Sequence, residues 1–256
     1  MLFLMNIFAF IFGAAIGSFL NVCIFRLPAE TSIIKPGSRC PKCLHPLRFY
    51  DNIPLISYLM LRGKCRDCGA KISWRYPLVE FITALLALLL FMKFDLTLNF
   101  LIFFIFTAVL IIITFIDLDH QIIPDVITLP GIPLFFLAAV FLMKEVTWRD
   151  ALLGLLIGGG MLFVIALVYE LITKREGMGG GDIKLLAMIG GFLGWKSLMF
   201  VLLFSSFSGA IVGITAMIIN KQDMKYAVPF GPFLSAAAVA YLFWGDAFMR
   251  LLIAGY

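Results

Sequence analysis

Hydrophobic residues in this chain follow one another in eight stretches separated by short polar segments. Most stretches approach the roughly 20 apolar residues that an α-helix needs to cross a hydrocarbon core of about 30 Å. The stretches are residues 2–25, 78–92, 96–116, 126–143, 151–172, 183–193, 198–219 and 230–254. The pattern therefore predicts an all-α polytopic membrane protein with about eight transmembrane helices, of which the sixth is short.

Composition excludes a soluble globular domain. The 256 residues are 62% hydrophobic and only 14% charged, and their mean hydropathy is +1.06. Soluble domains are about 45–50% apolar and about 25% charged. A surface this poor in polar residues has to face lipid.

Positive charge is concentrated in the first polar loop. Ten of the 20 Lys and Arg residues lie between Arg26 and Arg75, where there are only three acidic residues, so the loop has a net charge of +7. With this loop on the cytoplasmic side, the eight-span topology places 15 basic residues inside and five outside. That bias is typical of membrane topology, and it explains the basic loop without a nucleic-acid partner.

Four of the five cysteines form two Cys-x-x-Cys pairs in the same loop, Cys40 with Cys43 and Cys65 with Cys68. Two such pairs supply the four thiolates that structural zinc prefers, and four protein ligands leave no open position for catalysis. The loop is therefore predicted to be a cytoplasmic, zinc-ribbon-like element. The alternative is a membrane thiol oxidoreductase that uses the pairs as disulfides, but disulfides are rare in the reducing cytoplasm.

Acidic residues gather where predicted spans meet the inner polar loops. Asp117, Asp119 and Asp125 follow the third span, and Asp182 follows a run of glycines before the sixth. Acids at membrane depth are functional candidates, and two carboxylates brought together can share one proton, as in aspartic proteases.

Several alternatives stay open at this point. Asp117 and Asp119 are about 200° apart on a helix, so only one can face a given partner. A helix N-cap is the structural alternative for Asp182, and capping or a turn is the alternative for Asp125. Intramembrane acids also serve proton-coupled transporters, although those place them near the midplane.

Several short motifs occur in order along the whole chain. They are Gly17-Ser18-Phe19-Leu20-Asn21-Val22, the two cysteine pairs, Arg75-Tyr76-Pro77-Leu78-Val79-Glu80, Ile116-Asp117, Ile123-Pro124-Asp125, Gly179-Gly180-Gly181-Asp182 and Pro229-Phe230-Gly231-Pro232. Together these motifs resemble the type IV prepilin peptidase family. The resemblance implies that Asp117 and Asp182 are the catalytic aspartates, which resolves the choice between Asp117 and Asp119. The Gly-x-Gly-Asp signature is shared with other intramembrane aspartyl proteases, whereas the cysteine loop is particular to the bacterial enzymes.

The resemblance also implies a bifunctional enzyme of the bacterial inner membrane. Its substrates would be type IV prepilins or the pseudopilins of type II secretion, cleaved at a Gly-Phe junction on the cytoplasmic face and then N-methylated with S-adenosylmethionine. The expected organisation is a first transmembrane helix (residues 1–25), a four-cysteine zinc loop (26–77) and an aspartyl protease core (78–256). The methyl-donor site, the carboxylate that acts as base, the particular substrate and the oligomeric state are not predicted.

Overall fold

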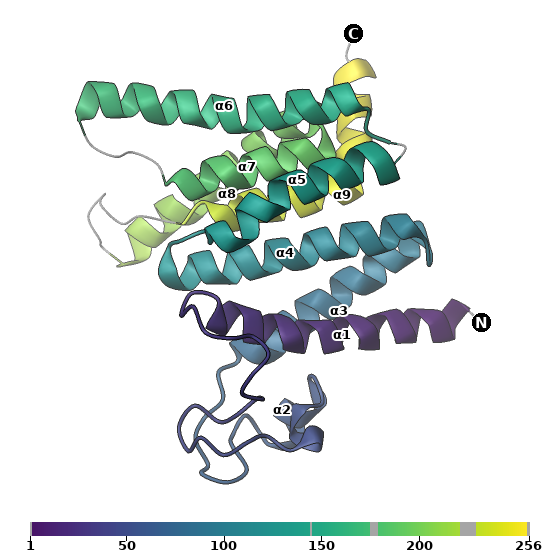
Figure 1. Cartoon of the computed structure of the whole chain (residues 1–256), viewed down its shortest axis with the longest axis vertical. Coiled ribbons are helices and arrows are strands. Elements are labelled where there is room, and N and C mark those ends of the chain that lie inside the picture. Colours follow the sequence, from purple (N-terminus) through teal and green to yellow (C-terminus); the bar gives the residue numbers. More distant parts are fainter. Residues whose placement is uncertain (1, 144, 175–178, 221–228, 255–256) are drawn as a thin grey trace. The chain divides into compact units, whose positions relative to one another are not determined.

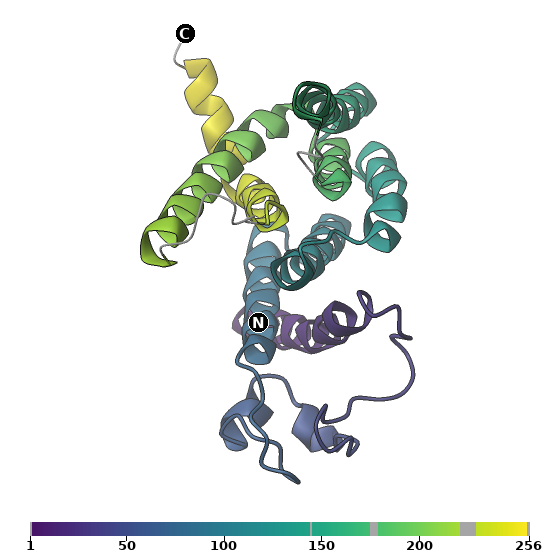
Figure 2. The same cartoon turned by 90° about the vertical axis from the view of Figure 1, so that its left-hand side faces the viewer.

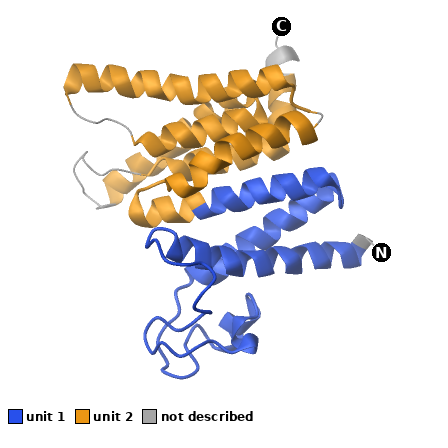
Figure 3. Ribbon diagram, viewed as in Figure 1, with its two compact units in different colours: residues 1–112 blue, residues 113–256 orange. Residues whose placement is uncertain are grey.

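The computed structural model describes residues 2–143, 145–174, 179–220 and 229–254. Regular structure in these residues is helical, and strand-like pairing is limited to two isolated bridges, Arg39 with Pro46 and Lys64 with Lys71. The prediction of an all-α protein is confirmed. The chain divides into two compact units, residues 1–112 and 113–256 (Figure 3).

The helices follow the predicted hydrophobic stretches closely. They are α1 (Leu2–Arg26), the 3₁₀ helix η1 (Phe49–Asn52), α2 (Ile56–Met60), α3 (Arg75–Phe94), α4 (Leu98–His120), α5 (Asp125–Leu142), α6 (Trp148–Thr173), α7 (Gly180–Leu193), α8 (Trp195–Asn220) and α9 (Gly231–Ala254) (Figure 1).

Among the described residues, seven helices are long and apolar enough to cross a membrane, namely α1, α3, α4, α5, α6, α8 and α9. The eighth predicted stretch, residues 183–193, lies in α7. This helix has 14 residues, about 21 Å at 1.5 Å per residue, which is short of a hydrocarbon core. The chain is therefore a multi-pass membrane protein in which one core helix is shorter than the bilayer is thick.

In unit 1, α1 and α3 pack at very short range through small residues. An added Cβ at Gly13 would lie 2.5 Å from the Cβ of Ala87, and one at Gly17 would lie 2.7 Å from the Cα of Glu80. Two glycines four residues apart thus let the backbones approach, as is common in membrane helices. Phe12 of α1 also contacts Phe104 in the first part of α4, with 5.5 Å between ring centroids.

In unit 2, α7 is the central helix. All nine residues from Leu185 to Leu193 are buried, and α7 contacts α5, α6, α8 and α9. Figure 2 shows α7 beside both α5 and α6. Gly154 and Gly158 of α6 lie against the α7 backbone at Gly190 and Leu186, respectively, where neither glycine has room for a Cβ. Because neighbouring helices cover α7, this short helix is buried by protein and does not need to span the lipid.

Several chain segments that are distant in sequence reach the same end of unit 2. The C-terminal end of α4 and the N-terminal ends of α5, α7 and α9 lie together on the left in Figure 1. Helix N-termini carry unpaired N–H groups and a partial positive charge. This end of the unit is therefore suited to hold carboxylates.

Candidate functional site

Asp117 lies in the last turn of α4 and is almost fully buried, with 5% of its surface exposed. The helix continues to His120, so Asp119 is turned away from Asp117, as its 200° offset requires. Asp119 is indeed exposed. The structure thus separates two acids that are close in sequence, with Asp117 inside the protein and Asp119 at its surface.

The buried carboxylate of Asp117 is held by the start of α9. The backbone N–H of Gly231, the first residue of that helix, donates a hydrogen bond of 3.0 Å to Oδ2 of Asp117. An added Cβ at Gly231 would lie 2.6 Å from the same oxygen. Glycine is therefore required here for close approach, and the contact joins residues 114 positions apart.

Asp182 lies in the first turn of α7, where the helix dipole favours a negative charge. The N-cap of α7 is Gly179, not Asp182, so the capping alternative for Asp182 is wrong. The carboxylate turns back towards the N-cap, because its Oδ2 lies 3.9 Å from the position of an ideal Cβ on Gly179. Asp182 is close enough to Asp117 for their carboxylates to interact electrostatically.

Ile123 connects the elements that carry the two aspartates. It lies between α4 and α5, and its Cβ would be 2.7 Å from an added Cβ on Gly181. Its Cδ1 would be 3.1 Å from an added Cβ on Gly231. The glycine next to Asp182 and the glycine that contacts Asp117 therefore both pack against the side chain of Ile123.

The third candidate acid, Asp125, is the first residue of α5 and forms an ion pair with Lys184 of α7, with 2.6 Å between Nζ and Oδ1. The N-cap of α5 is Pro124. The partner of Asp125, Lys184, lies two residues after Asp182 in the chain. Exposed ion pairs of this kind contribute little stability, and the pair links the N-terminal ends of α5 and α7.

The four predicted metal ligands come together in unit 1. The Sγ atoms of Cys40, Cys43, Cys65 and Cys68 all lie within 4.8 Å of one another. Cys40 and Cys68, which belong to different pairs, have their sulfurs 3.8 Å apart. Tetrahedral zinc with Zn–S bonds of about 2.3 Å requires sulfurs about 3.8 Å apart. The cluster therefore fits one four-sulfur metal site, and the cross-pair contact disfavours two independent redox pairs.

Each cysteine pair lies on a turn of the same construction. The Cys40 N–H donates to the carbonyl of His45 and Leu44 N–H donates back to Cys40, while Cys65 makes the equivalent bonds with Ala70 and Gly69. Leu44 and Gly69 both have positive φ, at 58° and 68°, a conformation that glycine adopts at no steric cost. Hydrogen bonds from the backbone N–H groups of Cys43 and Lys42 lower the pKa of the Cys40 thiol to about 6. The pKa of the Cys43 thiol is raised to about 12, because the hydrogen bond from the His45 backbone, which lowers it, is outweighed by desolvation and the neighbouring sulfurs, so Cys40 is the one of the two that favours the thiolate.

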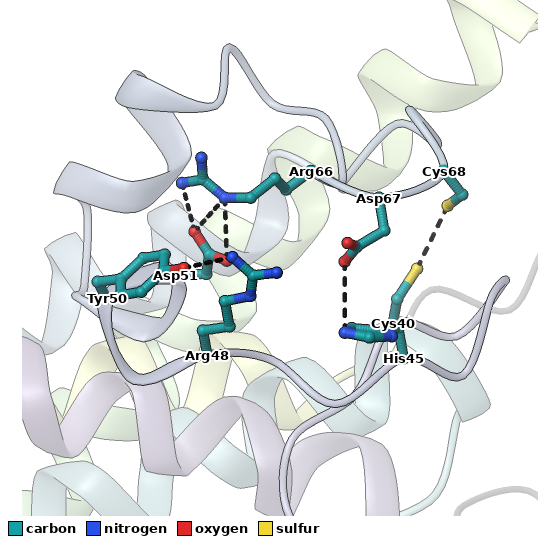
Figure 4. A network of polar contacts seen from close by, with 8 residues as sticks. All are labelled: Cys40, His45, Arg48, Tyr50, Asp51, Arg66, Asp67 and Cys68. Carbon is teal, nitrogen blue, oxygen red and sulfur yellow. Dashed lines mark hydrogen bonds and ion pairs between the residues drawn. The ribbon is translucent and has the colours of Figure 1, made fainter.

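Hydrogen bonds and ion pairs between side chains stabilise the loop around the sulfurs (Figure 4). Arg66 donates to both carboxylate oxygens of Asp51, at 2.7 and 3.0 Å to Oδ1 and 3.2 Å to Oδ2. This contact raises the pKa of Arg66. Arg48 donates to the hydroxyl of Tyr50 at 2.6 Å, and Arg66 also lies over the Tyr50 ring. Paired charges of this kind hold the loop in one arrangement.

Sequence reasoning missed the roles of Gly231 and Lys184. The motif that contains Gly231 was visible, but a backbone N–H that reaches a carboxylate 114 residues away has no signature of its own. In the sequence, Lys184 stands out only as one of the 15 basic residues on the inner side of the predicted topology. Its spacing of two residues from Asp182, in a helix that is otherwise apolar, was the available signal.

Comparisons with known proteins agree along the chain. Residues 11–94 match the model of the bacterial peptidase A24 N-terminal domain, and residues 104–214 match the type IV leader peptidase family. No solved structure matches.

Three relatives named prepilin leader peptidase/N-methyltransferase illustrate the similarity. The chain is 40% identical to the protein of Aeromonas hydrophila over 96% of this chain and 93% of the relative. It is 38% identical to that of Pseudomonas aeruginosa PAO1, over 95% and 92%, and 44% identical to that of Myxococcus xanthus DK1622, over 84% and 64%. From the two family models, and from the Aeromonas and Pseudomonas relatives that align over more than nine tenths of their length, we conclude that this chain belongs to the type IV leader peptidase family.

Proposed function

We propose that this protein cleaves the leader peptide of type IV prepilins or pseudopilins with Asp117 and Asp182, and N-methylates the new N-terminus. One observation carries the peptidase half of the proposal. Two aspartates from different helices lie within electrostatic range of each other, and one of them is buried and hydrogen-bonded by a backbone N–H. The names of the relatives support both activities.

The proposed reaction is hydrolysis by a carboxylate pair that shares one proton. One carboxylate accepts a proton from water as the water oxygen attacks the scissile carbonyl carbon, and the protonated partner donates to the carbonyl oxygen. Collapse of the tetrahedral intermediate breaks the C–N bond: the carboxylate that took the proton from water gives it to the leaving amine, and the other carboxylate recovers its proton from the hydroxyl of the gem-diol. The two groups titrate as a pair.

The position of the aspartates suits a substrate that leaves the membrane at this point. Asp117 ends one helix and Asp182 begins another, so both lie near the ends of helices and not at their midpoints. This favours a peptide cleft over a proton-coupled transporter, whose acids would lie near the midplane. The charge bias of the loops supports a site at the cytoplasmic face of the inner membrane, where the basic leader of a prepilin would precede its apolar helix.

The cofactor assignments follow the same lines of support. Zinc would be held by the four cysteine thiolates as a structural ion that keeps residues 26–77 folded between α1 and α3. S-adenosylmethionine is proposed as the methyl donor, on the strength of the relatives' methyltransferase name. We retain residues 1–25, 26–77 and 78–256 as the functional organisation: first helix, zinc loop and protease core.

The decisive experiment is cleavage of a prepilin with a Gly-Phe junction by the purified protein in lipid, followed by substrate mass. Asp117→Asn and Asp182→Asn are expected to reduce the rate by about two to four orders of magnitude, as for loss of a general acid or base. Asp119→Asn is the matched control, since Asp119 is exposed in the same helical turn, and it should cut normally.

The outcomes separate the assignments. If the wild type cuts while both variants are folded and inactive, the dyad is established, and a later mass gain of one methyl group tests the second activity. If both variants still cut, the catalytic assignment is wrong. If the wild type leaves the substrate whole, the proposed function itself fails.

A further inference from the structure

An apolar surface is exposed on the segment of the cysteine loop that contains η1 and α2, residues 49–60, which we call the η1–α2 segment. Phe49 is 85% exposed, Leu59 73% and Met60 76%, and Ile56 is 54% exposed. Ile56, Leu59 and Met60 follow the i, i+3, i+4 spacing and so lie on one face of α2. Four large apolar side chains presented together by 12 residues are unusual for a water-facing surface.

Three polar side chains of the same segment form hydrogen bonds within the loop. Asp51 is bound by Arg66, and the Tyr50 hydroxyl accepts a hydrogen bond from Arg48 (Figure 4). The Ser57 hydroxyl donates to the backbone carbonyl of Tyr50 at 2.9 Å and is buried. These contacts fix η1 against α2, so the segment has a polar, internally bonded side and an apolar, exposed side.

A hydrogen bond attaches this segment to the membrane-spanning helix α3. The backbone N–H of Leu55, just before α2, donates a hydrogen bond of 2.8 Å to Oε2 of Glu80. Glu80 is buried and lies five residues after the start of α3, which is about 7–8 Å along the helix axis. Its carboxylate also accepts a hydrogen bond from Ser18 of α1. The contact ties Leu55, the residue before α2, to α3, and Figure 1 shows α2 beneath α1, within the length of that helix.

We propose that the η1–α2 segment is an interfacial membrane anchor, whose apolar face inserts into the adjacent leaflet of an anionic phospholipid bilayer. The segment connects to two candidate membrane spans, α1 and α3, so a bilayer lies next to it. Glu80 lies within the first two turns of α3, so its contact with Leu55 puts α2 at the boundary between headgroups and acyl chains. The loop carries a net charge of +7, which complements anionic headgroups. Basic residues together with large apolar side chains are the usual features of such anchors.

The same charge argues against the proposed substrate as the occupant of this face, since a basic leader would be repelled by a basic loop. The anchor does not depend on the proposed function: it concerns lipid contact by unit 1 and uses neither Asp117 nor Asp182. It would hold the four-cysteine cluster at a fixed height at the membrane surface.

Site-specific photocrosslinking of the full chain tests the proposal. p-Benzoylphenylalanine is placed at Phe49 or Leu59, the protein is reconstituted in nanodiscs of phosphatidylglycerol or of phosphatidylcholine, and intact mass after irradiation measures phospholipid adducts. The matched control is the same residue at Lys42, which is exposed on the turn between Cys40 and Cys43. Adducts at Phe49 and Leu59 should exceed those at Lys42 roughly tenfold, and should be more frequent with phosphatidylglycerol.

A second variant removes the apolar face without touching the contacts that fold the loop. Leu59→Glu with Met60→Glu, in the Phe49 reporter, should abolish the lipid adduct while bound zinc per chain stays unchanged. The proposal is overturned if adducts at Phe49 and Leu59 are no more frequent than at Lys42, or if the double variant leaves them unchanged. Adducts with the mass of a second protein chain would also overturn it. Since the readout is lipid mass, a failure here is distinct from a failure to cleave prepilin.

Discussion

Replacing Gly231 by alanine tests whether the position of Asp117 matters for the chemistry. An added Cβ would lie 2.6 Å from Oδ2 of Asp117 and 3.3 Å from its Cγ. Ordinary contact begins at 3.4 Å, so the carboxylate has to move by about 0.8 Å. The side chain of Asp117 is flexible enough to do so, and the helix backbones can stay in place.

The expected result is a loss of activity with little loss of stability. A misplacement of about 1 Å in a catalytic group can cost roughly 100-fold in rate. We therefore expect kcat for prepilin cleavage to fall about 100-fold, with a smaller change in KM. The melting temperature should stay near that of the wild type, because alanine is a better helix former than glycine.

The assay is cleavage of a Gly-Phe prepilin peptide by protein in nanodiscs, with thermal unfolding measured on the same samples. Gly209→Ala is the matched control: its Cβ would meet Phe233 of α9 at 3.6 Å, an ordinary contact, so both rate and stability should be unchanged. A variant at Gly231 that keeps kcat within about twofold of the wild type would refute the link between Asp117 placement and rate. Combined with Asp117→Asn it should add no further loss, since both changes act on one group.

Four further outcomes are expected. Gly181→Ala should lower the cleavage rate, because its Cβ meets Ile123 at 2.7 Å, whereas Gly180→Ala in the same turn meets no atom of the described residues within 4 Å and should cut normally; equal rates would contradict this. Gly154→Ala, which meets the α7 backbone, should lower the free energy of unfolding by about 1–3 kcal/mol, and Gly160→Ala, with nothing within 4 Å, should not, as denaturant titration in detergent will show. Cys65→Ser should abolish zinc binding, measured by elemental analysis, and open residues 26–77 to protease; full zinc content would contradict a four-thiolate site. The cleavage rate should be bell-shaped against pH for a carboxylate pair sharing a proton, and a flat profile would count against the pair.

Most helices could be predicted from the sequence because a helix that crosses lipid needs a long apolar stretch. Apolar stretches located α1 and α3 to α9, although α3 begins at Arg75 and not at residue 78. Hydropathy fails there because α3 begins with Arg75, Tyr76 and Pro77, which are less apolar than the rest of the helix. Hydropathy also gave no sign of α2, since five helical residues in a basic loop are too few to produce a pattern.

The candidate site was only partly predictable, for reasons of distance along the chain. Spacing showed that Asp117 and Asp119 face different ways, and the resemblance chose between them; the structure buries Asp117 and exposes Asp119. The cysteine cluster followed from spacing alone, because each pair is a local turn. The contacts from Gly231 to Asp117 and from Leu55 to Glu80 use backbone N–H groups, which every residue except proline possesses, so no letter of the sequence marks them.

The contact between α6 and α7 has a consequence for how this protein can change over evolution. Gly154 and Gly190 face each other backbone to backbone, and neither has room for a Cβ. A clash between two side chains can be relieved by making the partner smaller, but here the partner is already glycine. Second-site suppressors of a substitution at either position therefore have to move α6 or α7 as a whole, and α7 carries Asp182 in its first turn. The two glycines are expected to tolerate no compensated exchange, so the freedom of this family to vary should be confined to the faces of α6 that look away from α7.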